Sequence, residues 1–138
     1  MIAVYNQMLH EEKSPVALPF SAGLHPWHAD QLSLEALSAT LDQIANNQHL
    51  IAFGETGLDK GCIIPLQIQL DVFELHLKKA VKQNKPVILH CVKAWEELIE
   101  ISANYQLTKI LHGYNGSTGL TEHLLKEGYC FSIGKEIL

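Results

Sequence analysis

The chain has 138 residues, 47% of them hydrophobic and 18% charged, and ten Lys and Arg against fifteen Asp and Glu give a formal net charge of -5. This length and composition exclude a disordered, collagen-like or low-complexity chain and predict a single domain over residues 1–138 that needs no disulfide staple. The acidic balance, without a Lys or Arg run, excludes a broad basic surface for nucleic acid but leaves open a concave site with local positive charge, such as a bound metal ion.

The sequence also bears on the compartment. No apolar run approaches the length of about eighteen residues that a membrane span requires, so we expect no membrane partner. The first residues lack the basic and apolar regions of a secretory signal. Cys62, Cys91 and Cys130 are widely spaced and form no C-x-x-C pair, which is typical of thiols in a reducing cytosol. We therefore expect a cytoplasmic protein.

Short apolar runs alternate with longer amphipathic stretches along the chain. The short runs are mostly rich in Val, Ile or Phe and predict strands at 2–5, 20–24, 50–54, 86–90, 109–112 and 129–133. Apolar spacings of three and four predict helices between them, namely one after a Ser33 cap over 34–44, then 65–84, 95–102 and 120–128. Strand and helix in succession predict βαβ units around a parallel sheet.

Two α/β architectures fit such a pattern. A doubly wound open sheet is common at this length, whereas a (β/α)8 barrel typically needs about 250 residues. Length alone therefore favours the open sheet. Both folds place their functional residues at the carboxyl ends of the strands, so the residues at those positions matter most.

Several of the predicted strands end in a residue that can bind metal or move protons. Glu55, His90 and His112 follow three of the apolar runs and would meet in one cavity, where a carboxylate and two imidazoles could hold Zn²⁺, Mn²⁺ or Fe²⁺. A single histidine at a strand end is more often a capping or core residue, but three coincidences favour a ligand set. His25 is more simply interpreted as shaping its loop, with Trp27 packed over it. Asp59 could cap the loop after Glu55 or orient a histidine.

The motifs together resemble one family, the TatD-type metal-dependent hydrolases, which are deoxyribonuclease-like (β/α)8 barrels. The similar segments are SAGLHP at 21–26, GETGLD at 54–59, the helix with Gln69, Phe73, Leu77 and Ala80, PVILH at 86–90, HGYNG at 112–116 and FSIG at 131–134. Each is weak alone, but their order and spacing make a specific signal. The resemblance implies the barrel architecture rather than the open sheet.

The resemblance also implies roles for individual residues. Glu55 would be a catalytic carboxylate that bridges metal ions, and His90 and His112 would be metal ligands. His25, Asp59 and Lys93 would contact substrate, with Lys93 standing where the family usually has an Arg. The cofactor would be a divalent ion, with Zn, Mn, Mg and Fe not distinguished, and the reaction would be hydrolysis of DNA or a small phosphoester by metal-activated water.

Two family features are absent from the sequence, namely the H-x-H pair of the first strand and the metal-binding Asp of the last. The resemblance therefore predicts a partial barrel with strands two to seven. Such a chain should bind one divalent ion weakly and show little phosphodiesterase activity. It should either self-associate through its open edges or be a gene fragment that has lost the missing strands. Two alternatives remain open at this point: an amidohydrolase-like enzyme acting on a small molecule, and a degenerate domain that serves as an interaction protein.

Overall fold

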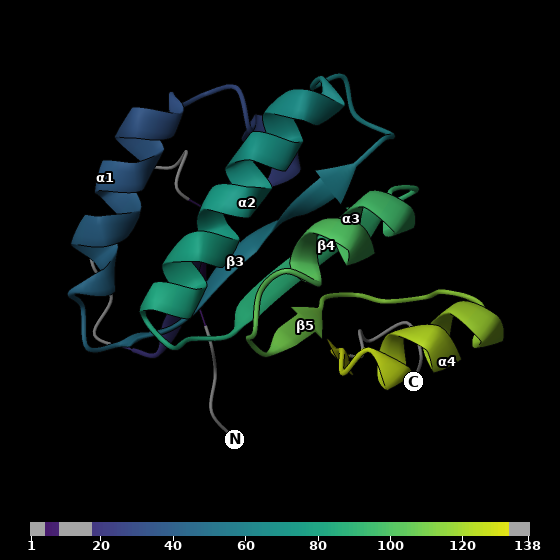
Figure 1. Cartoon of the computed structure of the whole chain (residues 1–138). Helices are drawn as coiled ribbons and strands as arrows, with labels where there is room; N and C mark the ends of the chain where they lie inside the picture. The colour runs from purple at the N-terminus through teal and green to yellow at the C-terminus, as the bar shows by residue number, and fades with distance from the viewer. Residues whose placement is uncertain (1–4, 9–17, 133–138) are drawn as a thin grey trace.

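The computed structural model describes residues 5–8 and 18–132, in which strands and helices alternate (Figure 1). The strands are β1 (Tyr5–Met8), β2 (Phe20–Gly23), β3 (Leu50–Asp59), β4 (Val87–Val92), β5 (Lys109–Leu111) and β6 (Cys130–Phe131). The helices are α1 (Leu34–Ala45), α2 (Leu66–Lys82), α3 (Trp95–Ser102) and α4 (Thr118–Lys126), and a short 3-10 helix, η1 (Pro26–His28), follows β2.

All six strands belong to one parallel sheet whose spatial order is the chain order, β1-β2-β3-β4-β5-β6. A doubly wound sheet would reverse its strand order at a switch point, and this sheet does not. Consecutive parallel strands, most of them joined by a helix, form the wall of a (β/α)8 barrel. The partial barrel is therefore confirmed over the described residues.

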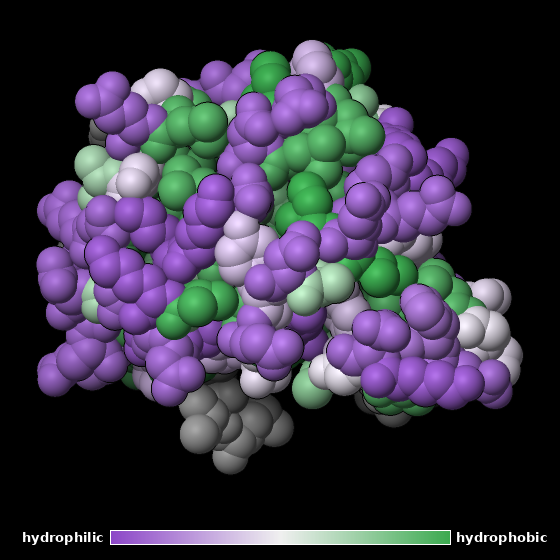
Figure 2. All heavy atoms as spheres, viewed as in Figure 1, coloured by the Kyte–Doolittle hydropathy of each residue, from purple (hydrophilic) through white to green (hydrophobic). Residues whose placement is uncertain are grey.

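The helices cover one face of the sheet (Figure 1). On β4 and β5, Val87, Leu89 and Leu111 are buried against helices, whereas Ile88 and Ile110, which are paired in the register, are only partly buried. Side chains alternate between the two faces of a strand, so the isoleucines lie on the face that carries no helix among the described residues. Figure 2 shows the helix-covered side, which is mainly hydrophilic with apolar residues between the helices.

Capping and packing explain the helix boundaries. The Ser33 side chain accepts a hydrogen bond from the Ala36 amide at 3.1 Å and begins α1, as predicted. The longest helix, α2, begins after Pro65 and buries Phe73 and Leu77 in the core shared with β4 and β5. In the described part of the chain, no helix is both long and apolar enough to cross a membrane.

Two strand predictions need correction. The described part of the first strand is Tyr5–Met8, so this strand continues past its predicted end at residue 5, and residues 2–4 lie outside the described residues. The third strand does not end at Gly54 but continues to Asp59, because Gly54 and Gly57 adopt φ values of 125° and 139° that let the backbone follow β4 through an irregular register. The predicted end of the last strand, at residue 133, also lies outside the described residues.

Candidate metal centre

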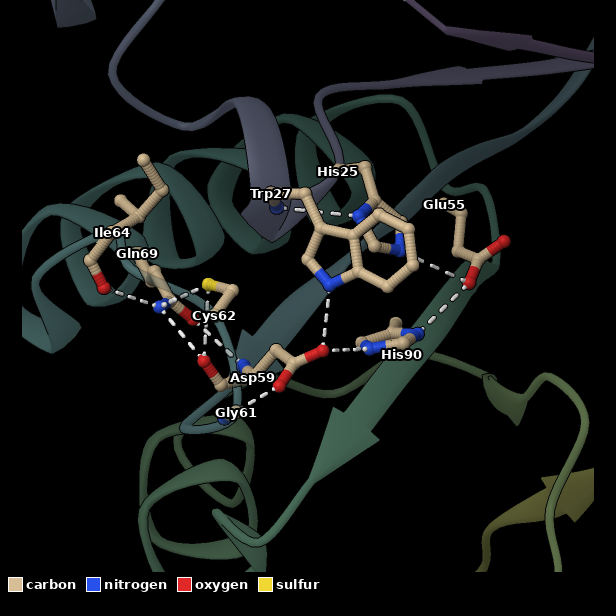
Figure 3. A network of polar contacts seen from close by, with 9 residues as sticks. All are labelled: His25, Trp27, Glu55, Asp59, Gly61, Cys62, Ile64, Gln69 and His90. Atoms are coloured by element: carbon tan, nitrogen blue, oxygen red, sulfur yellow. Dashed lines mark hydrogen bonds and ion pairs between the residues drawn. The ribbon is translucent and has the colours of Figure 1, made fainter.

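Three predicted residues meet near the carboxyl ends of neighbouring strands (Figure 3). His25 follows β2, Glu55 lies in β3 and His90 lies in β4. One nitrogen of each imidazole and one oxygen of the carboxylate lie within 4.8 Å of one another. His25 and Glu55 are buried and His90 is half-buried, so their ligand atoms form a compact, largely enclosed group.

Glycines bring the three backbones together. A side-chain Cβ at Gly23 would lie 2.6 Å from Gly54 Cα, and one at Gly57 would lie 2.0 Å from the carbonyl oxygen of His90. Neither distance is sterically possible without moving a strand. These glycines therefore allow β2, β3 and β4 to approach closely enough for the side chains to converge.

Asp59 fixes the orientation of His90. Its Oδ2 lies 2.9 Å from His90 Nε2, and because an ionised carboxylate only accepts, Nε2 must donate the proton. The other ring nitrogen, Nδ1, then faces Glu55 Oε1 at 3.3 Å. An imidazole held in this way presents Nδ1 to a metal ion, as is usual for metal-binding histidines.

Trp27 and nearby backbone groups hold Asp59 in turn. The indole Nε1–H donates to Asp59 Oδ2 at 2.7 Å, and the Gly61 amide donates to Oδ1 at 2.7 Å. The buried Gln69 side chain accepts from the Asp59 amide at 2.7 Å and donates to its carbonyl oxygen at 3.0 Å. Both sequence interpretations of Asp59 thus describe the structure, since it closes the loop after β3 and orients a histidine.

Whereas the ring of His90 is fixed by a hydrogen bond that it donates, the ring of His25 is fixed by one that it accepts. Its Nδ1 accepts the Trp27 backbone N–H at 3.2 Å, so the neutral ring carries its proton on Nε2. That Nε2 lies 3.6 Å from Glu55 Oε1. Although its geometry places His25 in the group, its hydrogen bonding suits a proton donor better than a metal ligand. His90 and Glu55 are better suited to hold a metal ion.

The charges of the group support an ionised carboxylate. Burial alone would raise the pKa of Glu55, but the hydrogen bonds from His25 and His90 and the charge of His112 outweigh it and lower the pKa to about 2. For His90, burial lowers the pKa, but the hydrogen bonds to Glu55 and Asp59 outweigh it and raise the pKa. Without a metal ion, a proton at His90 Nδ1 balances the two carboxylates.

His112 lies next to His90 but outside the close group. Leu89 of β4 pairs with Leu111 of β5, and His90 and His112 are the residues that directly follow them in the sequence. The His112 amide donates to the Leu89 carbonyl at 2.9 Å, which places His112 beside His90 on the same face. Its side chain is exposed, with Nδ1 3.2 Å from Ser132 Oγ. The predicted ligand His112 is therefore nearby, whereas His25, predicted as a substrate contact, lies nearer Glu55.

Lys93 immediately follows β4 and is exposed, with a positive φ of 56°. It lines a cavity of about 340 Å³ together with Lys60, Trp95, Glu96 and Glu97. Lys60 forms an ion pair with Glu97. Lys93 forms no ion pair with another described residue, so its charge is available at this end of the sheet.

The donor set fits a divalent metal ion. Glu55 would supply an ionised carboxylate oxygen and His90 would supply Nδ1, while Asp59 accepts the hydrogen bond that fixes the imidazole. A carboxylate with imidazole suits several first-row ions and does not select among them. Sequence reasoning missed Gln69 and Trp27 as supports of Asp59, because these contacts, 10 and 32 residues apart in sequence, follow no helix or strand periodicity.

Comparison with known proteins identifies the family. The sequence matches the family described as TatD related DNase over residues 5–138. The chain belongs to this family. It is 36% identical over 119 residues to the human protein named 3'-5' RNA nuclease TATDN2, covering 81% of this chain and 15% of that protein. It is 35% identical over 118 residues to the 3'-5' ssDNA/RNA exonuclease TatD of Erwinia amylovora, covering 82% of this chain and 45% of that protein.

Solved structures of TatD proteins show the same fold. The crystal structure of YJJV, a TatD homolog from Escherichia coli, superposes with a TM-score of 0.70 and 30% identity, covering 82% of this chain and 46% of that chain. A TatD family hydrolase from Entamoeba histolytica superposes with a TM-score of 0.69 at 20% identity, covering 83% of this chain and 41% of that chain, which shows the fold alone. The chain thus spans less than half the length of these relatives.

Proposed function

We propose that this chain takes part in metal-dependent hydrolysis of phosphodiester bonds in single-stranded nucleic acid. The observation that carries the proposal is the convergence of Glu55 and His90, with His90 oriented by the buried Asp59. The names of the relatives, which describe ssDNA/RNA and RNA nucleases, support a nucleic acid rather than a small molecule as the substrate. DNA or a small phosphoester was the substrate class expected from the sequence.

Glu55 and His90 would hold the ion, and His112 would complete the ligand set from the neighbouring strand. A divalent ion at such a site lowers the pKa of a water molecule and neutralises charge on a phosphate. Glu55 remains ionised at neutral pH because its pKa is about 2. Its catalytic contribution is therefore negative charge and hydrogen-bond acceptance rather than proton donation.

Two further groups would contact the phosphate. His25 carries its proton on Nε2 and would donate it in a hydrogen bond to a phosphate oxygen near Glu55. Lys93 would supply a positive charge from the end of β4. Asp59 would act on the substrate only through His90 and Trp27.

Metal-dependent shortening of an end-labelled single-stranded oligonucleotide tests this proposal. The parent chain with Mn²⁺ or Mg²⁺ should shorten the oligonucleotide slowly, EDTA should stop the reaction, and Glu55→Gln should reduce the rate to background. Leu125→Ala, at an exposed position on α4, is the control and should keep the parent rate. Shortening that persists in EDTA, or at the parent rate in Glu55→Gln, would contradict the proposal, as would no shortening by the parent chain.

The assembly and location of the protein are part of the same proposal. We infer self-association through the open edges and through the face of β4 and β5 that no described helix covers, where Ile88 and Ile110 are half-buried. Parallel sheets are normally covered on both faces, which supports this inference. Cytoplasmic localisation also remains a proposal, supported by the free thiols of Cys62, Cys91 and Cys130.

A further inference from the structure

Trp27 is a large aromatic side chain that is exposed and yet fixed in place. The residue is 56% exposed, although it lies in the short helix η1 directly after His25. Its Nε1–H donates to the buried Asp59 carboxylate at 2.7 Å, and its ring makes an edge-to-face contact with His25 at a centroid distance of 4.9 Å. The indole therefore has a defined orientation without being part of the core.

The indole stands at the edge of the candidate metal centre. Its centroid lies 6.1 Å from that of His90, whose ring shares the same Asp59 oxygen. In Figure 3 the indole is seen face-on among His25, Glu55, Asp59 and His90, and none of the drawn side chains lies in front of it. An exposure above one half also requires that at least one face of the ring be open to solvent.

Single exposed apolar residues are common and need no explanation by themselves. Leu125 on α4 is 57% exposed, for example, and lies far from the site in sequence. Trp27 differs because a buried carboxylate holds it, and because that carboxylate also orients His90. Rigidity and position, rather than exposure, distinguish the indole.

We propose that Trp27 is a stacking platform for a nucleobase next to the phosphodiester that the centre binds. This inference rests on the proposed function and specifies how that site would recognise single-stranded substrate. The bases of a single strand are unpaired, and each offers a π face to an aromatic side chain whatever its sequence. A base on the indole is one sugar away from its phosphate, which would then lie over the imidazoles of His25 and His90.

The platform explains how an acidic chain can bind nucleic acid. Its net charge of -5 provides little general attraction for phosphates, so affinity must come from local contacts. Stacking is an apolar contact and depends little on net charge. Fixing the indole before binding also lowers the entropy cost of ordering it.

The test measures binding of two labelled single strands of equal length, one of thymidines and one entirely abasic, in metal-free buffer at low salt. Trp27→Ala should bind the thymidine strand about tenfold more weakly than the parent, which is the usual effect of losing one stacked base. It should bind the abasic strand as tightly as the parent does. Trp27→Phe keeps a ring but loses the hydrogen bond to Asp59, and should stay within about threefold of the parent. Leu125→Ala is the exposure-matched control and should change neither affinity.

The inference would be overturned by equal weakening of the binding of both strands in Trp27→Ala, by weakening of neither, or by no binding of the thymidine strand by the parent. If Trp27→Phe loses as much affinity for the thymidine strand as Trp27→Ala does, the role of Trp27 is to support Asp59 rather than to stack on a base. Hydrolysis is not needed for this measurement. Suppose that Trp27→Ala weakens binding of the thymidine strand alone, and that the parent shows no metal-dependent hydrolysis. This result would retain the stacking platform and reject the proposed function.

Discussion

The imidazole of His90 lies between two carboxylates and shows how one residue can prepare a metal site. Asp59 binds the proton on Nε2, while Glu55 faces Nδ1. A metal ion at Nδ1 would replace a proton that the two carboxylates stabilise. Metal binding should therefore release protons and weaken as the pH falls.

Removing the negative charge of Asp59 tests this arrangement. Asp59→Asn should weaken binding of Mn²⁺ by about 10–100-fold, the usual effect of changing a group that orients a metal-binding histidine. Calorimetric titration measures the change. Asp30→Asn, at an exposed position, is the matched control. Equal affinities of the two variants would show that Asp59 does not orient His90 for metal.

A second histidine should control stability in acid. His76 is completely buried in α2, where its Nε2 accepts the Leu24 amide at 3.1 Å and its Nδ1 donates to the Val72 carbonyl at 2.8 Å. Burial lowers its pKa to about 4. The unfolded chain binds a proton near pH 6.5 and the folded chain does not until about pH 4, so stability should fall as the pH decreases between these values.

The difference in unfolding free energy between the parent chain and His76→Gln isolates this effect. Glutamine can accept and donate the same hydrogen bonds but does not titrate. The parent should lose about 3 kcal/mol relative to the variant between pH 7 and pH 4, measured by urea unfolding at each pH. The exposed His123→Gln is the control. A difference that does not change with pH would mean that folding does not lower the pKa of His76.

At the scale of elements, the contact between β3 and β4 determines whether the centre can form. Gly57→Ala places a methyl group 2.0 Å from the His90 carbonyl oxygen at a φ of 139° that alanine rarely adopts. The variant should lose more than about 2 kcal/mol of stability or fail to unfold cooperatively. Chemical denaturation measures both outcomes.

Gly119→Ala is the matched control, because the Cβ there meets no atom within 4 Å and φ is not positive. It should remain within about 1 kcal/mol of the parent. A Gly57→Ala chain as stable as Gly119→Ala would show that β3 and β4 are not as close as described.

These two strands also show what can be inferred from sequence. Apolar spacing predicted the 95–102 helix correctly, because that helix buries one regular face. It did not predict the extension of β3 through Gly57, because the glycines that punctuate a sequence also permit close backbone contact. Glu55, His90 and His112 were expected to meet, whereas the structure groups Glu55 and His90 with His25 and leaves His112 outside. The hydrogen bonds that distinguish His25 from His90 depend on Trp27 and Asp59, and no local pattern indicates them.

At the scale of the whole molecule, the face of β4 and β5 that no described helix covers should govern assembly. Ile110 lies on this face beside Ile88, and a charge there should oppose burial against a second copy. In sedimentation equilibrium, the apparent molecular mass of the parent should rise above the 15.4 kDa of one chain as the concentration increases. The apparent mass of Ile110→Lys should stay at 15.4 kDa. Ile63→Lys, at a position 97% exposed, should behave as the parent. A parent that stays monomeric at every concentration would contradict self-association.

The central claim, that Glu55 and His90 form the core of a divalent metal site, is tested most directly by calorimetric titration of Mn²⁺ and Zn²⁺. The parent should bind about one ion per chain, and Glu55→Gln, His90→Ala and His112→Ala should each bind at least about tenfold more weakly. His123→Ala should bind as the parent does. Absence of binding by the parent, or unchanged affinity in Glu55→Gln and His90→Ala, would contradict the account.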